Sequence, residues 1–349
     1  MKHLLKIGLL CSALSGLTAC TSSNNNTNEV QMVDTWDKTF KLSDKVNHSK
    51  VTFKTRFGNT LVADMYVPKN NHGKFAAIAV SGPFGAVKEQ ASGLYAQTLA
   101  QRGFLTIAFD PSFTGESSGT PRYMASPDIN TEDYQAAVDF LSNLENVDNQ
   151  KIGIIGICGW GGIALKAAAA DTRVKATVAS TMYDMTRVTR NGYFDHEDSK
   201  EKRHEKLVAM NKQRTADFAS RNYERDGGLP NILPSDVPQF VVDYYDYYKK
   251  PRGYHVRSLN SNGGWTKVSN LSFMNTHMLS TIGEIDSAVM LIHGEKAHSR
   301  YMSETAYKEL KGDNKLLVII PNANHVDLYD RTDVIPFNQI EQFFNEYLK

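Results

Sequence analysis

Hydrophobic and polar positions along the chain follow two spacings in turn. Short apolar runs, which predict buried strands, alternate with longer stretches whose apolar residues lie three or four positions apart, as in amphipathic helices. We interpret as strands the runs 51–57, 61–67, 75–81, 104–109, 151–157, 174–180, 288–293 and 316–320. The helical stretches are 92–102, 131–144, 163–170, 303–311 and 335–348. This alternation predicts an eight-stranded, mostly parallel sheet with helices on both faces, in which the first two strands form an antiparallel hairpin.

Residues 183–280 interrupt the alternation. They contain clusters of Asp, Lys, Arg and Tyr and several helix-like stretches, but no convincing strand. Because the segment lies between two predicted strands, we expect a helical cap over the strand ends of the sheet. The run 241–248 (V-V-D-Y-Y-D-Y-Y) puts aromatic side chains on more than one helical face. That pattern is typical of packing between a cap and its core, and also of an aromatic-lined pocket.

The first twenty residues have the pattern of an export signal. Lys2 and Lys6 precede an apolar stretch, 7–17, that is too short to span a bilayer. It ends in L-T-A-C at 17–20, which resembles the lipobox of bacterial lipoproteins. The resemblance implies cleavage before Cys20, acylation of that cysteine and an extracytoplasmic protein held by lipid in the bacterial cell envelope. An ordinary secretory signal with a chance cysteine is the alternative.

Composition and charge narrow the function classes. Among 349 residues, 39 Lys and Arg face 38 Asp and Glu, so no basic field favours a nucleic-acid partner. The hydrophobic content of 41% is enough for a sizeable core. We therefore expect a signal peptide, a lipidated cysteine with a flexible tether, a core in two parts and the cap between them: 1–19, 20–49, 50–182 with 281–349, and 183–280.

Residues that could take part in catalysis lie at the predicted carboxyl ends of strands, where α/β sheets bind ligands. Cys158 follows the fifth strand, and it is the one thiol left once Cys11 leaves with the signal and Cys20 is acylated. His325 lies on the loop after the last strand and is the best candidate for a general base. The turn 81–85 after the third strand contains glycines, and its N–H groups are candidates for an oxyanion hole.

From about residue 50 to its end the chain resembles the α/β-hydrolase superfamily. The stretch 156–162, G-I-C-G-W-G-G, looks like the nucleophile elbow of the dienelactone hydrolase branch, whose members use cysteine. With 179–187 (A-S-T-M-Y-D-M-T-R) and 293–300 (H-G-E-K-A-H-S-R) it is similar to a bacterial subgroup, and G-I-C-A-S-G-G is a related fungal pattern from polyketide-transferring hydrolases. The resemblance implies an α/β-hydrolase fold, Cys158 as nucleophile and His325 as base. It also implies an oxyanion hole built from Gly82, Pro83, Phe84 and Gly159.

Two features depart from the usual pattern. Trp160 stands two positions after the cysteine, where a small residue is expected, so a structural cysteine is the alternative. The usual place of the triad acid holds Ala297, so Glu295 is our first candidate for the acid and Asp184, after the sixth strand, is the second. The literal G-x-S-x-G match at 115–119 is followed by Thr-Pro and not by a helix, so we do not expect the nucleophile there.

The expected reaction is cleavage of an ester, thioester or lactone in a small acyl-bearing substrate. Cys158 would attack as a thiolate, because a helix N-terminus and a neighbouring histidine both lower the pKa of a thiol. His325 would carry the proton and a carboxylate would orient it. We expect no cofactor and no metal ion, since His293 and His298 lack a third ligand suited to zinc. An acyltransferase with the same triad and a non-catalytic lipoprotein that binds an apolar ligand are the alternatives.

Overall fold

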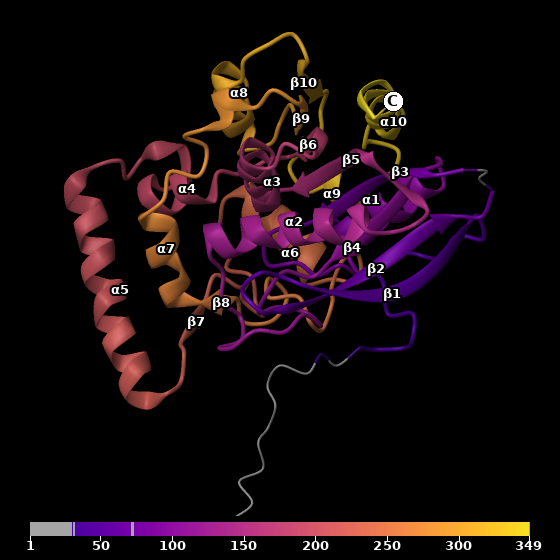
Figure 1. Cartoon of the computed structure of the whole chain (residues 1–349). Helices are drawn as coiled ribbons and strands as arrows, with labels where there is room; N and C mark the ends of the chain where they lie inside the picture. Colours follow the sequence, from indigo (N-terminus) through magenta and orange to yellow (C-terminus); the bar gives the residue numbers. More distant parts are fainter. Residues whose placement is uncertain (1–29, 31, 71–72, 349) are drawn as a thin grey trace, which may run out of the picture.

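The structure, a computed structural model, describes residues 30, 32–70 and 73–348. The predicted signal peptide, Cys20 and most of the predicted tether lie outside the described residues. One sheet of eight strands runs through the molecule in the order β1-β2-β4-β3-β5-β6-β9-β10 (Figure 1). Its strands are β1 (Val46–Lys54), β2 (Thr60–Pro68), β3 (Phe75–Ser81), β4 (Leu105–Phe109), β5 (Val147–Ile157), β6 (Val174–Ser180), β9 (Ala288–Gly294) and β10 (Lys315–Ile320).

The strand directions confirm the predicted fold class. β2 pairs antiparallel with both β1 and β4, and every other neighbouring pair in the sheet is parallel. This is the order and direction of the α/β-hydrolase fold. The central strands β4 and β9 are buried at every position, as expected for parallel strands covered on both faces. All the parallel strands end at the same edge, so the loops after β3, β5, β6, β9 and β10 meet there.

Helices cover both faces of the sheet. α1 (Ala91–Ala100) and α10 (Phe337–Tyr347) pack together on one face. α2 (Pro127–Ser142) and α3 (Gly159–Ala170) pack together against β5 on the other, and α8 (Arg300–Glu309) lies against β9 and β10. The short α9 (Asp327–Asp330) follows β10. None of the helices in the described part of the chain is both long and apolar enough to cross a bilayer.

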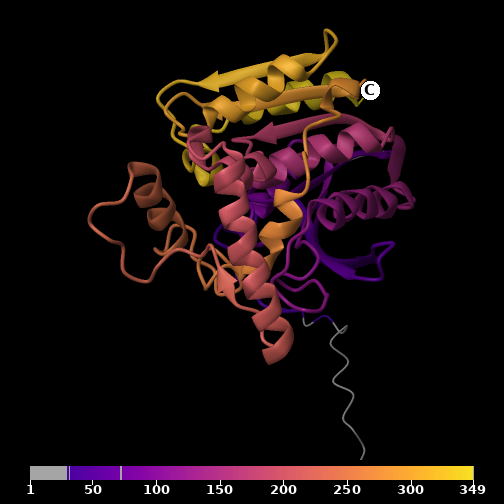
Figure 2. The same ribbon diagram turned by 90° about the vertical axis from the view of Figure 1, so that its left-hand side faces the viewer.

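The segment 183–280, which we call the insertion, connects β6 to β9. Its longest element, α5, stands beside the sheet in Figure 1 and crosses the near side of the molecule in Figure 2. Our expectation of no strand here needs a small correction, because two two-residue strands pair antiparallel. The elements are α4 (Met185–Asn191), α5 (Lys200–Ser220), β7 (Arg225–Asp226), α6 (Gln239–Tyr248), β8 (Trp265–Thr266) and α7 (Asn270–Met274), with 3-10 turns η1 (Tyr193–Asp195) and η2 (Lys267–Ser269); a third, η3 (Ile282–Glu284), follows it.

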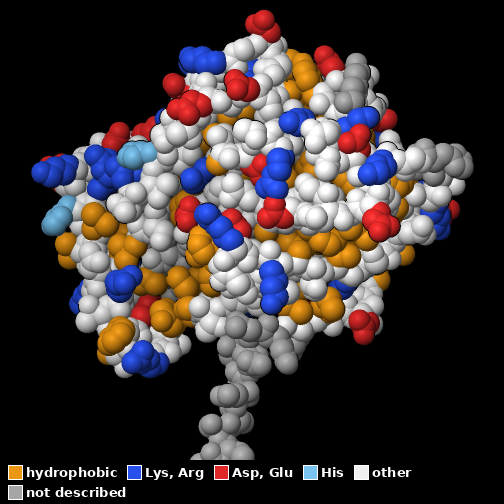
Figure 3. Space-filling model, in the orientation of Figure 1, with side chains coloured by type: hydrophobic (Ala, Val, Ile, Leu, Met, Phe, Trp, Pro, Cys, Tyr) orange, Lys and Arg blue, Asp and Glu red, His pale blue; other side chains and the backbone are white. Residues whose placement is uncertain are grey.

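The outer surface of the insertion is partly apolar. Hydrophobic side chains gather at the lower left of Figure 3, where Figure 1 shows the lower part of α5. Val208 and Phe218 of α5 are 55% and 70% exposed.

Ser199 begins this helix by accepting a hydrogen bond from the Lys202 N–H through its hydroxyl, at 3.1 Å.

Candidate active site

Cys158 occupies a sharp turn between β5 and α3. Its φ of 57° and ψ of −127° lie where residues other than glycine are rarely found. The backbone is held there by three hydrogen bonds: the Cys158 N–H donates to Ser180 O at 2.9 Å, and the N–H groups of Gly161 and Tyr183 donate to Cys158 O at 2.8 and 2.9 Å. A strained residue between a strand and a helix, fixed by its surroundings, has the geometry of a nucleophile elbow.

Trp160 lies behind this turn. Its indole is 1% exposed and meets the rings of Phe109 and Tyr134 edge to face, at centroid distances of 5.6 and 5.3 Å. A Cβ added at Gly156 would come within 2.0 Å of Trp160 O. The turn therefore requires glycine at the end of β5, two residues before Cys158. The large side chain therefore fills the core and leaves Cys158 facing the cavity described below.

The loop after β3 lies directly against the elbow. A Cβ at Gly82, whose φ is 102°, would meet Ile157 O at 2.3 Å, so only glycine permits this approach. The backbone N–H groups of Phe84 and Gly159 lie beside the Cys158 sulfur, and each lowers the pKa of the thiol. Of the four residues predicted for the oxyanion hole, these two present donors to the sulfur and Gly82 permits the close approach. Pro83 has no N–H and contributes only to the shape of the turn.

His325 is buried beside the elbow, and each hydrogen-bond partner of its ring among the described residues is a hydroxyl. Its Nδ1 lies 2.7 Å from Ser299 Oγ and 2.8 Å from Thr181 Oγ1. Its Nε2 lies 3.0 Å from the hydroxyl of Tyr329. Burial, followed by the neighbouring His298 and His293, lowers the pKa of His325 well below its ordinary value. The ring is therefore neutral at physiological pH.

Neither carboxylate predicted as the acid is brought to His325. Glu295 is exposed, and its Oε2 accepts a hydrogen bond from the Asn322 N–H at 2.8 Å. Asp184 caps α4 by accepting from backbone N–H groups of that helix. The place of the acid is taken by Thr181, directly after β6, and Ser299, on the loop after β9. Hydroxyl residues are common in such loops, so no pattern in the sequence pointed to these two.

Tyr329 connects the cysteine to the histidine. Its hydroxyl lies 3.0 Å from Nε2 of His325, and beside the Cys158 thiol it lowers the pKa of that thiol. Tyr329 lies in the short α9, four residues after His325, which precedes that helix on the same loop. Sequence reasoning missed this tyrosine, although an i, i+4 pair after the last strand was a visible signal.

The resting thiol is protonated, contrary to the expectation of a thiolate. Burial raises the pKa of Cys158. Tyr329 and the two backbone N–H groups act in the opposite direction but do not outweigh burial. The helix N-terminus and the histidine, on which the expectation rested, cannot hold a charge that the apolar surroundings disfavour. Cys158 and His325 thus form a neutral pair.

A cavity of about 520 Å³ opens above Cys158. Its lining is mainly apolar and aromatic, with Phe84 and Tyr329 from the core and most other residues from the insertion. Val241, Tyr244 and Tyr248 line it from one face of α6, whereas Tyr247 is buried against Tyr329 at a centroid distance of 5.0 Å. Both interpretations of the run 241–248 therefore hold, each for a different helical face.

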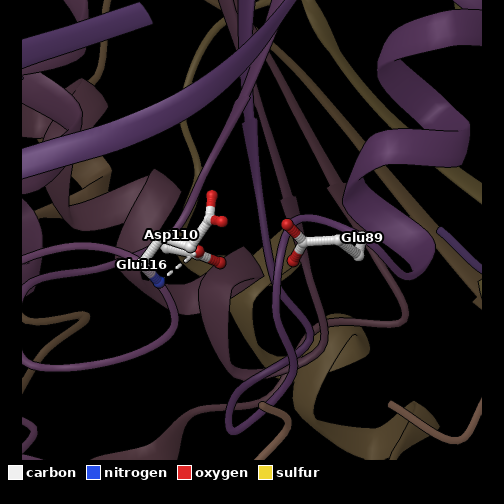
Figure 4. Close-up of side chains that lie close together, drawn as sticks. All are labelled: Glu89, Asp110 and Glu116. Atoms are coloured by element: carbon white, nitrogen blue, oxygen red, sulfur yellow. Dashed lines mark hydrogen bonds between the residues drawn. The ribbon is translucent and has the colours of Figure 1, made fainter. Parts of the chain in front are cut away.

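A second buried polar cluster connects the loop of Phe84, after β3, with the loop after β4. Glu89, Asp110 and Glu116 bring carboxylate oxygens within 4.8 Å of one another (Figure 4), the only such group of three potential metal ligands in the described residues. The Lys88 ammonium lies 2.6, 2.9 and 2.6 Å from Glu89, Asp110 and Glu116. We call these four residues the ionic cluster. Lys88 supplies the positive charge that a cation would bring, so the arrangement is that of a buried ion-pair network.

The chain is similar to a known protein family and to a bacterial protein of known structure. Residues 58–327 match the family described as X-Pro dipeptidyl-peptidase (S15 family). The uncharacterised protein PA2218 of Pseudomonas aeruginosa is 54% identical over 364 residues, covering 99% of this chain and 96% of its own. The crystal structure of PA2218 superposes with a TM-score of 0.89 at 56% identity, over 91% of this chain and 99% of that one.

Two fungal relatives match smaller parts of the chain. The thiohydrolase aneE of Aspergillus aculeatus is 32% identical over 139 residues, 40% of this chain and 43% of its own. The acyltransferase drtE of Aspergillus calidoustus is 31% identical over 134 residues, 38% of this chain and 42% of its own.

Proposed function

Because this chain belongs to the X-Pro dipeptidyl-peptidase (S15) family and is an α/β-hydrolase enzyme, we propose that it cleaves an ester, thioester or lactone through an acyl intermediate on Cys158. The observation that carries the proposal is the elbow itself. Cys158 is strained at the strand–helix turn, two backbone N–H groups lie beside its sulfur, and Tyr329, which also lies beside the thiol, contacts Nε2 of His325 at 3.0 Å. An enzyme of this family needs a nucleophile, and Cys158 alone stands at that place.

The first half of the reaction starts from the neutral thiol. The sulfur attacks the substrate carbonyl while its proton passes to the Tyr329 oxygen and the Tyr329 proton passes to Nε2 of His325. The new C–S bond places negative charge on the carbonyl oxygen, and the N–H groups of Phe84 and Gly159 stabilise it. The intermediate collapses as the bond to the leaving alcohol or thiol breaks, and His325 returns the proton to that group.

The second half regenerates the enzyme. Water attacks the thioester carbon and gives its proton to His325, and the carboxylic acid leaves as the Cys158 thiol recovers its proton. No charged base is needed at rest, which agrees with the lowered pKa of His325 and the raised pKa of Cys158. Charge arises only in the transition states and tetrahedral intermediates, where the N–H groups of Phe84 and Gly159 have their largest effect.

The cavity indicates the kind of acyl group. Its volume of about 520 Å³ suits a drug-sized molecule, and its aromatic lining favours a bulky apolar group over a short polar one. The similarity to a thiohydrolase and to an acyltransferase supports acyl chemistry with such groups. If an alcohol reaches the acyl-enzyme in place of water, the same residues perform acyl transfer, which is the second candidate function.

Intact-mass measurement with bulky aryl thioesters and p-nitrophenyl esters tests the proposal. We expect a transient mass increase equal to the acyl group, mapped to Cys158, and release of the acid. Cys158→Ala should remove both, whereas Ser117→Ala, in the literal G-x-S-x-G match, should keep both. An acyl adduct that persists in Cys158→Ala would overturn the proposal. Turnover of Ala-Pro-p-nitroanilide but of no ester would assign the chain to peptide cleavage.

Adding glycerol or an amine to the same reaction separates the two candidate functions. Hydrolysis predicts the free acid as the main product, and acyl transfer predicts an acylated glycerol or amide. A product ratio that rises with acceptor concentration, while consumption of the donor stays constant, would favour the transferase.

We also propose that the enzyme is a lipoprotein of the bacterial cell envelope, anchored at Cys20. The support is the L-T-A-C sequence at 17–20 after a short apolar stretch. Cys20→Ser should abolish labelling with a radioactive fatty acid and move the protein from the membrane fraction to the soluble one, without a change in esterase activity. Equal membrane retention of the variant would contradict the anchor.

A further inference from the structure

The side of His325 away from the cysteine leads into a chain of hydrogen bonds. Ser299 Oγ lies 2.7 Å from Nδ1 of His325 and 2.8 Å from Nε2 of His293. Nδ1 of His293 lies in turn 2.7 Å from Ser303 Oγ. All four side chains are buried, with at most 2% of each exposed. No carboxylate of the described residues is hydrogen-bonded to any of them.

Ser299 is used differently from an ordinary serine at its position. It directly precedes α8, where a serine hydroxyl commonly caps the helix by accepting from a backbone N–H. Here it makes no such bond, because its oxygen is engaged by two histidines. Ser303, one helical turn further on, reaches His293 from the same face of α8. The N-terminus of α8 therefore lacks a side-chain cap, and its serines hydrogen-bond to the two histidine rings instead.

We propose that Ser299 and His293 are positioning residues that hold His325 in its catalytic tautomer, in place of the carboxylate of a hydrolase triad. The inference rests on the proposed function, in which Nε2 of His325 takes a proton. Nε2 can do so only when the hydrogen of the neutral ring is on Nδ1.

The hydrogen-bond directions then follow along the chain. Nδ1–H of His325 donates to Ser299 Oγ, the Ser299 hydroxyl donates to Nε2 of His293, and Nδ1–H of His293 donates to Ser303 Oγ. Every donor meets an acceptor in this order. Thr181 Oγ1, at 2.8 Å from the same Nδ1, is a second acceptor for the His325 hydrogen.

A neutral chain suits this part of the molecule better than a carboxylate. An ionised acid would need a compensating partner in a site where burial already lowers the pKa of His293 to about 3. His293 stays neutral over the working pH range, so its Nε2 remains an acceptor and fixes the direction of the Ser299 hydroxyl. The chain provides the orientation that a carboxylate gives but less stabilisation of the imidazolium, so its removal should cost less than the removal of a triad acid.

The tautomer can be measured without any turnover, which keeps this test separate from that of the proposed function. In protein labelled with ¹⁵N-histidine, we expect the His325 shifts of a ring protonated on Nδ1, assigned by comparison with His325→Gln. Ser299→Ala and His293→Gln should each raise the fraction protonated on Nε2, and Ser299→Thr, which keeps the hydroxyl, should restore the wild-type spectrum. An unchanged tautomer in both disrupted variants would overturn the inference.

Kinetics give the second readout. Ser299→Ala and His293→Gln should each lower kcat by about 10²-fold and leave KM within about threefold, because the proton transfer and not binding is affected. Ser299→Thr should recover most of the rate. If Ser299→Ala does not fold, His293→Gln carries the test. A loss confined to KM or to the melting temperature, or a larger loss of kcat in Glu295→Gln than in Ser299→Ala, would overturn the inference. If no ester is turned over but the tautomer shifts as expected, the proposed function fails and the positioning role stands.

Discussion

Two buried polar regions of this chain are joined by one loop and follow opposite electrostatic arrangements. Phe84 presents its N–H to the active site, where Cys158, His325 and their hydroxyl neighbours are all neutral. Lys88, four residues later, is the centre of the ionic cluster with three carboxylates. Both regions are almost completely removed from water. The active site is built from neutral groups, whereas the ionic cluster pairs buried charges of opposite sign.

The difference shows how the loop separates two tasks. The ionic cluster fixes the backbone: the Lys88 N–H donates to Asp110 Oδ1 at 2.8 Å, and the Glu116 N–H donates to Asp110 Oδ2 at 2.9 Å. The Phe84 N–H is thereby held in place by charges that lie outside the cavity lining. The described groups that lie beside the thiol, the Tyr329 hydroxyl and two backbone N–H groups, are uncharged, so the charge that forms there during the reaction meets dipoles.

The largest effect is expected from removing the thiol at the centre of the neutral region. Cys158→Ala should lower kcat by about 10⁴-fold or more, because removing a nucleophile abolishes the covalent route. Its melting temperature should stay within a few degrees of the wild type, since the thiol is small. Steady-state kinetics and calorimetry on the same preparation check both parts. Activity that survives in Cys158→Ala would show that the neutral region is structural.

Lys88→Met breaks the charged region instead. It removes the cation that three buried carboxylates share and leaves Asp110 without an ion-pair partner among the described residues, although Lys50 still pairs with Glu116 and Arg257 with Glu89. This loss should cost about 3–5 kcal/mol of unfolding free energy. Denaturant unfolding measures this loss. The matched control is Lys206→Met, whose partly exposed ion pair with Glu197 should be worth at most about 1 kcal/mol. Equal effects of the two variants would mean that the ionic cluster does not hold the loop.

The sequence predicted the frame of the molecule better than its polar interior. Every predicted strand is present, although β1 begins at Val46 and β5 at Val147, both earlier than expected. Apolar periodicity reports burial on a sheet face, and the elbow at Cys158 follows from the strand end. Asp184 was a wrong expectation for contact with His325 because nearness to a strand end does not set the direction of a side chain, and a helix start took its carboxylate. The ionic cluster joins two loops, the one after β3 and the one after β4, and local patterns carry no information about such contacts.

The pH dependence of stability separates the two regions further. Burial lowers the pKa of His293 to about 3 and that of His298 to about 4. Below pH 6.5 the unfolded chain binds protons that these folded rings do not, so stability falls as pH drops, by about 1.4 kcal/mol per pH unit for each ring. The loss levels off near pH 4 for His298 and near pH 3 for His293. Burial alone would raise the pKa of Glu89, but Lys88 beside it lowers that pKa to about 2. Its contribution is complete above pH 4.5 and is lost between pH 4.5 and 2.

Melting temperatures across these windows test the assignment. His298→Gln should flatten the curve between pH 6.5 and 4.5, and Glu89→Gln should flatten it below pH 4.5. Each variant is the control for the other. A wild-type curve that is flat down to pH 4.5 would contradict neutral, buried histidines.

The smallest effect concerns the single hydroxyl between cysteine and histidine. Because burial raises the pKa of Cys158, iodoacetamide should label folded protein more slowly at pH 7 than a free cysteine peptide, and the rate should still be rising at pH 9. The Tyr329 hydroxyl favours the thiolate, so Tyr329→Phe should raise the thiol pKa further and slow labelling at pH 8 by a few-fold. Phenylalanine keeps the ring and thus the packing. Tyr223→Phe, on the surface, should leave the rate unchanged. Rapid labelling of the wild type at pH 6 would show that Cys158 is a thiolate at rest. The active site would then contain a charge, as the ionic cluster does.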